Sequence, residues 1–178
     1  MARTLLVIDI QSEYFPGGAL PLWQADGTEA RIVSAIGVAR AAGDRIVLVR
    51  HVSTAPTGLF LSESGIAIRP AVLSAAAGAP IVTKHYADAF QETDLAEHLA
   101  GTKELLICGM MTQNCVVFTA MSRSAERFDV TVIGDLCAAP SQPVHLIALS
   151  ALRSKTRVVE APGVWGELEA PSPELAQA

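Results

Sequence analysis

The amino-acid sequence predicts an α/β fold in which helices cover both faces of a parallel β-sheet. Short apolar runs alternate with longer segments of helical periodicity, which is typical of βα units around a parallel sheet. The apolar runs are nearly continuous in Val, Ile and Leu, as in strands that are buried on both faces. The predicted strands are residues 5–10, 45–51, 80–84, 104–109, 130–134 and 156–159.

Helices are expected between these strands, at residues 23–42, 93–100, 113–127 and 142–153. Gly43 and Gly101 stand where the first two of these helices must end. The segment 53–70 is rich in Ser, Thr, Gly and Pro and has no sustained period, which predicts a long loop of the kind that often carries function. The tail of residues 161–178 is expected to be irregular, either loosely packed or lying across a partner subunit.

The composition favours a single domain, residues 1–178, with a large core. The sequence is 51% hydrophobic and 17% charged, with a mean hydropathy of +0.37. Its net charge is −5 and it has no basic stripe, which excludes a nucleic-acid binder that relies on phosphate neutralisation. No apolar run reaches the roughly 20 residues that a membrane-spanning helix needs. The apolar excess is therefore expected in a core or in a subunit interface.

The N-terminal sequence has no apolar stretch with a cleavage site like that of a secretory signal, so we expect a cytoplasmic protein. The three cysteines, Cys108, Cys115 and Cys137, form no CxxC pair. This pattern offers neither a disulfide framework nor a zinc-ribbon site, so each thiol is either a core residue or a reactive one.

Three reactive side chains stand at or just after the carboxyl ends of predicted strands, where open α/β sheets build their sites. Asp9 lies in an apolar run, where an unpaired buried carboxylate is costly; capping a neighbouring turn is the alternative. Lys84 ends the third strand, a place where a lone lysine is usually solvated. Cys115 begins a helix, whose N-terminus lowers a thiol pKa and binds an oxyanion, although a buried core thiol is the default. Cys108 and Cys137 take that default.

Four segments resemble the isochorismatase-like cysteine hydrolases, a superfamily that includes nicotinamidases and N-carbamoylsarcosine amidase. They are residues 7–20 (VIDIQSEYFPGGAL), 83–90 (TKHYADAF), 109–116 (GMMTQNCV) and 132–138 (VIGDLCA), and they occur in the family's order. The resemblance implies a three-layer Rossmann-like fold with a six-stranded sheet of order 3-2-1-4-5-6. It also implies a homo-oligomer, either a dimer or a tetramer.

Carried over position by position, the resemblance implies that Cys115 is the nucleophile, Asp9 its base and Lys84 the partner that holds charge. It implies a cis peptide between Met110 and Met111, which would direct the N–H groups of Met111 and Cys115 at a developing oxyanion. The implied reaction is acyl transfer through a thioester, followed by hydrolysis.

The expected substrate is a small molecule, but the sequence departs from the nicotinamidase pattern. Those relatives bind a metal through an Asp-x-His pair and further histidines near the end of the second strand, where this sequence has only His51. One histidine with no carboxylate or thiolate beside it is not a metal site, so we expect no metal and no cofactor. His51 is then either a pocket-lining group or a packed residue at a strand end.

Other candidates for the substrate pocket follow from position alone. They are Gln11, Tyr14, Phe15, Leu20, His51, Phe60, Tyr86, Phe90, Gln113 and Asn114.

The leading hypothesis is a metal-independent cysteine amidase that acts on a small amide, ureido or related acyl compound. One alternative is cleavage of a vinyl ether, as in isochorismatases proper, but that chemistry uses the acid more than a thiol. A second alternative is a catalytically silent binding or redox-sensing relative, which would not need all three of Asp9, Lys84 and Cys115. A dinucleotide-binding oxidoreductase is weaker, because the sequence has no GxGxxG turn.

Overall fold

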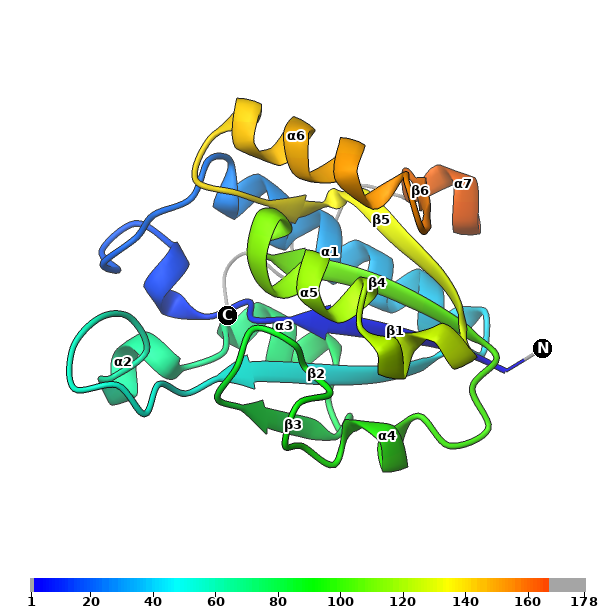
Figure 1. Cartoon of the computed structure of the whole chain (residues 1–178), viewed down its shortest axis with the longest axis horizontal. Helices are drawn as coiled ribbons and strands as arrows, with labels where there is room; N and C mark the ends of the chain where they lie inside the picture. The colour runs from blue at the N-terminus through cyan, green and yellow to red at the C-terminus, as the bar shows by residue number, and fades with distance from the viewer. Residues whose placement is uncertain (1, 167–178) are drawn as a thin grey trace.

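The computed structural model describes residues 2–166 and places six strands in one parallel sheet (Figure 1). The strands are β1 (Arg3–Ile8), β2 (Arg45–His51), β3 (Ile81–Lys84), β4 (Glu104–Met110), β5 (Asp129–Ala138) and β6 (Arg157–Val159). Their order is β3-β2-β1-β4-β5-β6, and every neighbouring pair is parallel. The predicted fold class and strand order are confirmed.

The helices lie on both faces of this sheet. They are η1 (Ser12–Tyr14), α1 (Ala25–Ala41), α2 (Glu63–Ile66), α3 (Pro70–Ala75), α4 (Leu95–His98), η2 (Thr112–Val116), α5 (Val117–Ala120), η3 (Arg123–Arg127), α6 (Gln142–Leu152) and α7 (Pro162–Trp165). Helices α1 and α3 pack together on one face, and α5 lies on the other face against α6 (Figure 1). None of the helices in residues 2–166 is long and apolar enough to span a bilayer.

Burial explains why the apolar runs form strands. Residues 5–8 of β1 and 105–108 of β4 are fully or almost fully buried, because both strands lie in the middle of the sheet between two layers of helices. Gly43 and Gly101 adopt left-handed backbone angles, with φ of +80° and +78°, after α1 and α4. These glycines end the helices as the sequence predicts.

Several predicted boundaries are wrong. The segment 113–127 is not one helix: η2 is π-helical, α5 is a single short turn, and Ser122 caps the separate 3-10 turn η3 with its side chain. Strand β1 ends at Ile8 rather than residue 10, because Asp9 turns the backbone to a positive φ of 53°. Strand β5 continues beyond Gly134 to Ala138, with a shift in its register against β4.

Short helices were also missed where the sequence predicts irregular structure. Helix α2 lies inside the predicted loop 53–70, and α3 begins at its last residue, Pro70, which stands at the first helical position as prolines often do. Helix α7 lies in the predicted irregular tail, of which residues 167–178 fall outside the described part of the chain. These helices are four to six residues long, too short for a helical period to be visible in the sequence.

Gly109 in β4 brings the central strands close together. Its φ is +125°, and a β-carbon at this position would overlap the carbonyl oxygen of Ile8 in β1. The two strands therefore approach closely just before Asp9 on one strand and the Met110–Met111 peptide on the other. That peptide bond is cis, as the family resemblance implied.

Candidate active site

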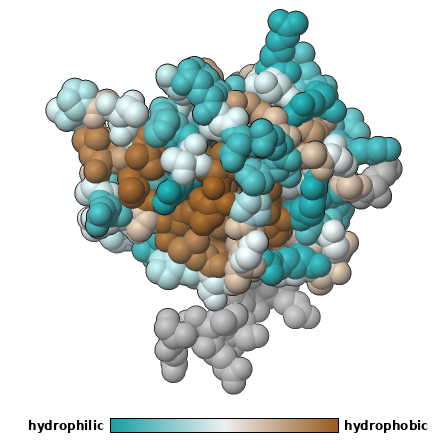
Figure 2. Space-filling model, turned by 90° about the horizontal axis from the view of Figure 1, so that it is seen from below, coloured by the Kyte–Doolittle hydropathy of each residue, from teal (hydrophilic) through white to brown (hydrophobic). Residues whose placement is uncertain are grey.

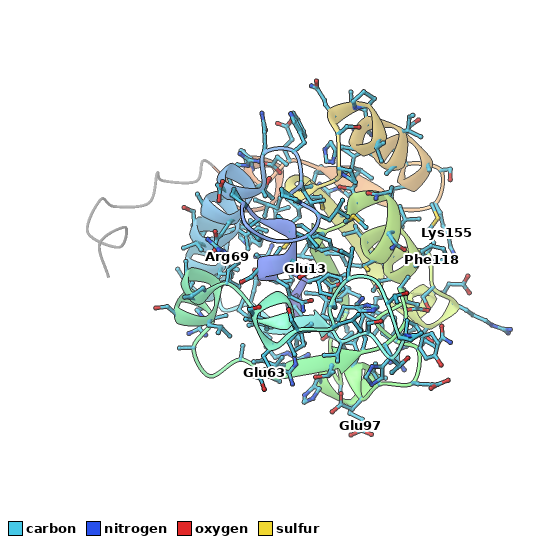
Figure 3. All side chains as sticks on the ribbon, turned by 90° about the vertical axis from the view of Figure 1, so that its left-hand side faces the viewer. Glu13, Glu63, Arg69, Glu97, Phe118 and Lys155 are labelled. Atoms are coloured by element: carbon cyan, nitrogen blue, oxygen red, sulfur yellow. The ribbon has the colours of Figure 1, made fainter. Side chains whose placement is uncertain are left out.

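The three predicted catalytic side chains meet at the carboxyl edge of the sheet, the edge that faces the viewer in Figure 3. Asp9 directly follows β1, Lys84 is the last residue of β3, and Cys115 lies in η2 after β4. Strands β1 and β4 are neighbours at the point where the strand order reverses. Open α/β sheets characteristically bind ligands at this point.

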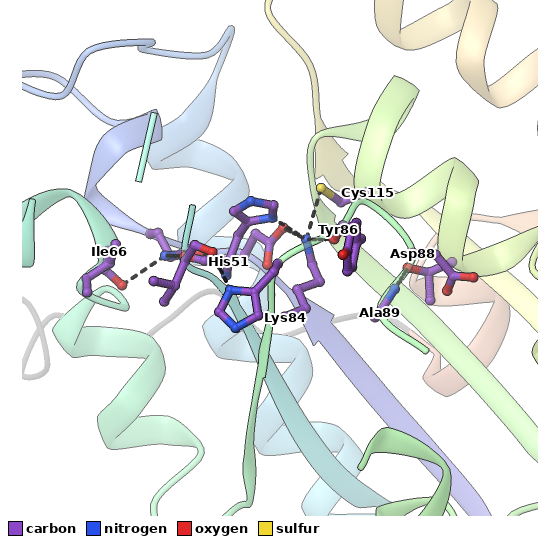
Figure 4. Close-up of polar contacts among 12 residues, drawn as sticks. His51, Ile66, Lys84, Tyr86, Asp88, Ala89 and Cys115 are labelled. Atoms are coloured by element: carbon purple, nitrogen blue, oxygen red, sulfur yellow. Dashed lines mark hydrogen bonds and ion pairs between the residues drawn. The ribbon is translucent and has the colours of Figure 1, made fainter. Parts of the chain in front are cut away.

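The ammonium group of Lys84 is the centre of this cluster (Figure 4). Its Nζ lies 2.8 Å from Oδ2 of Asp9, 3.2 Å from Sγ of Cys115 and 3.0 Å from Nδ1 of His51. It also donates to the backbone carbonyl of Tyr86 at 3.1 Å. The ammonium therefore links the carboxylate, the thiol and the imidazole. Lys84 is not the solvated strand-end lysine of the alternative interpretation.

Three side chains of the cluster are sealed from solvent. Asp9 and Lys84 are 0% exposed and Cys115 is 2% exposed. Neither carboxylate oxygen of Asp9 accepts a well-oriented hydrogen bond from a described residue, so the ion pair with Lys84 is its main compensation. An uncompensated buried carboxylate is strongly unfavourable, and Asp9 therefore depends on Lys84 for its charge.

Burial and charge together set the protonation of the cluster. Burial raises the pKa of Asp9, and the charge of Lys84 opposes this shift. Burial lowers the pKa of Lys84, but its interactions with Asp9 and Cys115 together outweigh burial and raise that pKa. Burial, together with the Asp9 charge, raises the pKa of Cys115 to about 12, although Lys84 opposes the rise. Cys115 therefore carries a neutral thiol at neutral pH.

Atoms of Asp9, His51 and Cys115 that suit a metal lie within 4.8 Å of one another. The expectation that His51 has no carboxylate or thiol beside it is therefore wrong. Asp9 and Cys115 are distant from His51 along the sequence, but the fold brings them close to it. The ammonium of Lys84 nevertheless lies within 3.2 Å of each of the three residues. It already places a positive charge among these ligands, and it would repel a divalent cation there.

The isochorismatase domain model matches residues 3–161 of the sequence. The chain belongs to the isochorismatase family. Its members are usually hydrolases, which gives this chain its broad activity class.

Similar proteins support this membership. The uncharacterised isochorismatase family protein YddQ of Bacillus subtilis is 30% identical over 166 residues, which cover 85% of this chain and 92% of YddQ. A solved isochorismatase hydrolase from Oleispira antarctica is 30% identical, with a TM-score of 0.82 and coverage of 93% of this chain and 97% of that chain. Nicotinamidase PncA from Bacillus subtilis is 23% identical with a TM-score of 0.78, covering 90% and 100% of the two chains, which shows a shared fold alone.

In this isochorismatase-family chain, Gln11 holds the backbone beside the site. Its Nε2 donates to the carbonyls of His51 and Ile66 at 2.8 and 2.9 Å, and its Oε1 accepts from the His51 N–H at 2.7 Å. The side chain is completely buried. Gln11 therefore joins the end of β2 to α2, and all three of these bonds are made to backbone.

The predicted aromatic candidates pack around His51 and the first loop. The Phe60 ring lies 5.1 Å from those of both Tyr14 and His51, measured between centroids, and its backbone has a left-handed φ of 62°. Phe15 is buried beneath the guanidinium of Arg69, which lies 4.3 Å from the ring centroid. Phe60 consequently covers one side of His51 from the long loop. Leu20 is partly buried against the core.

The remaining candidates lie near Lys84 and Cys115 in the sequence but differ in their contacts. The Tyr86 side chain is exposed, and only its carbonyl contacts Lys84. Phe90 stacks on Phe128, with centroids 6.3 Å apart. Gln113 donates to Sδ of Met111, and its Oε1 is sealed from solvent without a hydrogen-bond partner among the described residues. Asn114 is partly buried and its backbone N–H donates to the Met111 carbonyl.

Sequence reasoning missed one contact that holds the segment containing Cys115. Oγ1 of Thr112 lies 2.9 Å from Nδ1 of His145, and both groups are buried. Thr112 begins η2 and His145 lies in α6, so this bond ties the cysteine-bearing segment to the next helix. Nothing in the sequence indicates this pairing, because the two residues are 33 positions apart and belong to no common motif.

Proposed function

We propose that the chain is a cysteine-dependent hydrolase that cleaves a carbon–nitrogen bond of a small amide, ureido or related acyl compound. The observation that carries this proposal is the contact of one buried ammonium, Lys84, with both the carboxylate of Asp9 and the thiol of Cys115. A nucleophile, a base and a charge-holding group within hydrogen-bond reach form the arrangement that covalent acyl transfer needs.

The protonation of the cluster favours a base-assisted attack. Because the pKa of Cys115 is raised to about 12, the sulfur must lose its proton as it attacks. The ligand atoms of Asp9 and Cys115 are within 4.8 Å of each other, and the Asp9 carboxylate has lone pairs that no described residue uses in a hydrogen bond. Asp9 is accordingly the base that receives the thiol proton.

The reaction then follows in two halves. Asp9 takes the proton from Cys115, and the sulfur forms a bond to the substrate carbonyl carbon. The tetrahedral intermediate collapses, its carbon–nitrogen bond breaks, and Asp9 returns the proton to the leaving nitrogen. Water, deprotonated by the same carboxylate, then attacks the thioester. The carbon–sulfur bond breaks, Asp9 returns the proton to the sulfur to regenerate the Cys115 thiol, and the acid is released.

Two backbone groups are the proposed binding site for the oxyanion. The N–H groups of Met111 and Cys115 flank the first turn of η2, immediately after β4. Donors that are fixed before the reaction stabilise developing charge without a cost of reorganisation. Lys84 contributes a positive charge to the same site and favours the ionised form of Asp9 against the effect of burial.

The test is detection of an acyl-enzyme by intact mass after mixing with a panel of small carboxamides, ureas and N-carbamoyl compounds. A vinyl ether is included to detect the alternative reaction. Wild type and a Cys137→Ala control, which loses a buried thiol elsewhere, should form the adduct and hydrolyse the same compound. Cys115→Ala should do neither. Equal turnover by Cys115→Ala would disprove the role of the thiol.

We further propose that the protein is a homo-oligomer whose subunits meet through α5 and α6. Phe118 on α5, labelled in Figure 3, is 56% exposed, and Ile147 on α6 is 70% exposed, next to the exposed Leu146. A second copy of the chain would remove these side chains from water. The view from below shows another apolar area at the surface (Figure 2). Ile81 on β3 and Leu73 on α3 are further large apolar residues with exposed side chains.

A further inference from the structure

His51 has a defined tautomer because of its contact with Lys84. The ammonium carries only donors, so Nδ1 of His51, 3.0 Å away, must accept the hydrogen bond. The proton of the neutral ring therefore resides on Nε2. Burial, followed by the charges of Lys84 and His85, lowers the pKa of His51 to about 4, which keeps the ring neutral at physiological pH.

The Nε2–H group is an available donor at the boundary between the cluster and solvent. It makes no hydrogen bond with a described residue. In residues 2–166, the side-chain polar atoms that are sealed from solvent without a hydrogen-bond partner belong to Asp9 and Gln113. Nε2 of His51 is not among these atoms, so it is accessible to solvent. His51 is half-buried, whereas Asp9 and Lys84 are completely buried, so Nε2–H is the polar group of this cluster that a small molecule meets first.

The surroundings of His51 restrict what this donor can bind. Phe60 packs against the imidazole at a centroid distance of 5.1 Å, so one side of the ring is apolar. A ring nitrogen of His51 lies within 4.8 Å of the ligand atoms of both Asp9 and Cys115. A molecule whose carbonyl carbon contacts Cys115 therefore has its next few atoms beside His51.

We propose that His51 determines substrate specificity by donating a hydrogen bond from Nε2 to a second, neutral acceptor of the substrate. That acceptor is a carbonyl oxygen or an aromatic ring nitrogen a few bonds from the carbon that Cys115 attacks. A group with only donors in this place, such as an ammonium, is rejected because Nε2–H and Lys84 are both donors. The inference rests on the proposed function, in that it takes Cys115 as the reacting group.

Two substitutions separate the two nitrogens of His51. In His51→Asn, the side-chain amide occupies the place of Nδ1 and keeps an acceptor for Lys84, but no donor remains at the place of Nε2. In His51→Gln, the longer side chain returns an amide N–H near the place of Nε2. The Asn variant therefore tests the donor alone, and the Gln variant tests whether a donor restores recognition.

Alkylation of Cys115 provides a readout that needs no hydrolysis. Iodoacetamide carries a carbonyl acceptor, whereas iodomethane carries none, and Cys115→Ala gives the background for both reagents. The ratio of the two rates should fall about tenfold in His51→Asn, the size expected for one lost hydrogen bond, and should recover in His51→Gln. An unchanged ratio in His51→Asn would overturn the inference, whether or not both reactions are slowed, since it means that His51 does not recognise the acceptor.

The tautomer is tested separately by long-range proton–nitrogen NMR of the histidine side chains, assigned with the His51→Asn variant. A neutral ring with its proton on Nε2 at pH 7 is the expected result, and a proton on Nδ1 or a charged ring would overturn the inference. Failure of the proposed function is distinguishable: no amide would then be hydrolysed, while the alkylation ratio and the tautomer would still follow His51.

Discussion

Lys84 and Cys115 approach within 3.2 Å of each other in a place where neither side chain is more than 2% exposed. Charges act strongly on one another in such a place, because little water screens them. Two opposite charges therefore compete for the state of the Cys115 thiol. The carboxylate of Asp9 raises its pKa, and the ammonium of Lys84 lowers it.

This competition predicts that neutralising Asp9 and neutralising Lys84 move the pKa of the Cys115 thiol in opposite directions. In Asp9→Asn, Lys84 acts unopposed and the pKa of Cys115 falls below its value of about 12. In Lys84→Met, the shift is upward. Hydrolysis should nevertheless drop at least about 100-fold in Asp9→Asn, because the variant lacks the proposed base.

The measurement is the pH dependence of Cys115 alkylation by iodoacetamide, beside the rate of amide hydrolysis for each variant. Asp9→Asn should have a more reactive thiol at pH 8 than wild type and yet be the poorer hydrolase. A thiol pKa that moves the same way in both variants would contradict the assigned electrostatics.

His51 should make the folded protein less stable in acid. Its pKa is lowered from 6.5 to about 4 in the folded state, chiefly by burial, so the unfolded chain binds the proton more tightly. The stability that this group contributes is complete above pH 6.5 and is lost as the pH falls through about 4. His145, whose pKa burial also lowers, contributes in the same direction.

Urea unfolding of wild type and His51→Gln at a series of pH values tests this expectation. The free energy of unfolding of the variant should fall less than that of wild type between pH 6.5 and pH 4, with the His145 contribution remaining in both. Parallel curves for the two proteins would show that His51 is protonated equally in the folded and unfolded states.

Gly109→Ala should unfold or strongly destabilise the protein. The new methyl group would overlap the Ile8 carbonyl, and the φ of +125° is unfavourable for any residue with a β-carbon. We expect a loss of about 3 kcal/mol or more in the free energy of unfolding. Gly134→Ala is the matched control, because there the nearest atom, at 3.1 Å, is the end of the flexible Leu149 side chain.

The control should cost at most about 1 kcal/mol, since Leu149 can move by a few tenths of an ångström. Urea denaturation of both variants gives the comparison. Similar losses from the two substitutions would mean that the close approach of β4 to β1 is not what requires Gly109.

The sheet could be predicted from the sequence because its strands are covered on both faces and are therefore apolar throughout. Strand β2 was predicted with both of its boundaries, residues 45 and 51. The segment after Cys115 could not be predicted so well, because η2, α5 and η3 are set by tertiary contacts such as the Thr112–His145 bond rather than by local periodicity. The amphipathic pattern of the sequence alone predicted one continuous helix in their place.

The candidate catalytic residues could be predicted from strand ends and from family motifs, but their environment could not. Lys84 is uninformative in the sequence, where a lone lysine at a strand end has no visible partner. The structure gives it four contacts, of which one is a backbone carbonyl with no sequence signal. His51 gains its neighbours through the pairing of β2 with β3, where it lies opposite Lys84. Such cross-strand proximity follows from register and not from spacing along the chain.

The apolar excess of the sequence leads to the last prediction, the oligomeric state. Ile147→Lys places a charge on the most exposed of the large apolar side chains in residues 2–166, on the α6 face that we propose to be buried between subunits. A charge in a subunit interface without a partner is costly, so this variant should dissociate to monomers at concentrations where wild type is assembled. Leu73→Lys, on α3 at another apolar area, is the control and should remain assembled.

Light scattering coupled to size-exclusion chromatography, over a series of protein concentrations, gives the mass of each species. A wild-type monomer at every concentration would contradict the proposed assembly. Dissociation of Leu73→Lys alone would instead place the interface on the α3 and β3 side. Circular dichroism of each variant shows whether its subunits are still folded when the mass changes. We expect Ile147→Lys to stay folded, because the side chain of Ile147 is 70% exposed within one subunit. A lower mass of this variant would then reflect lost contacts between subunits.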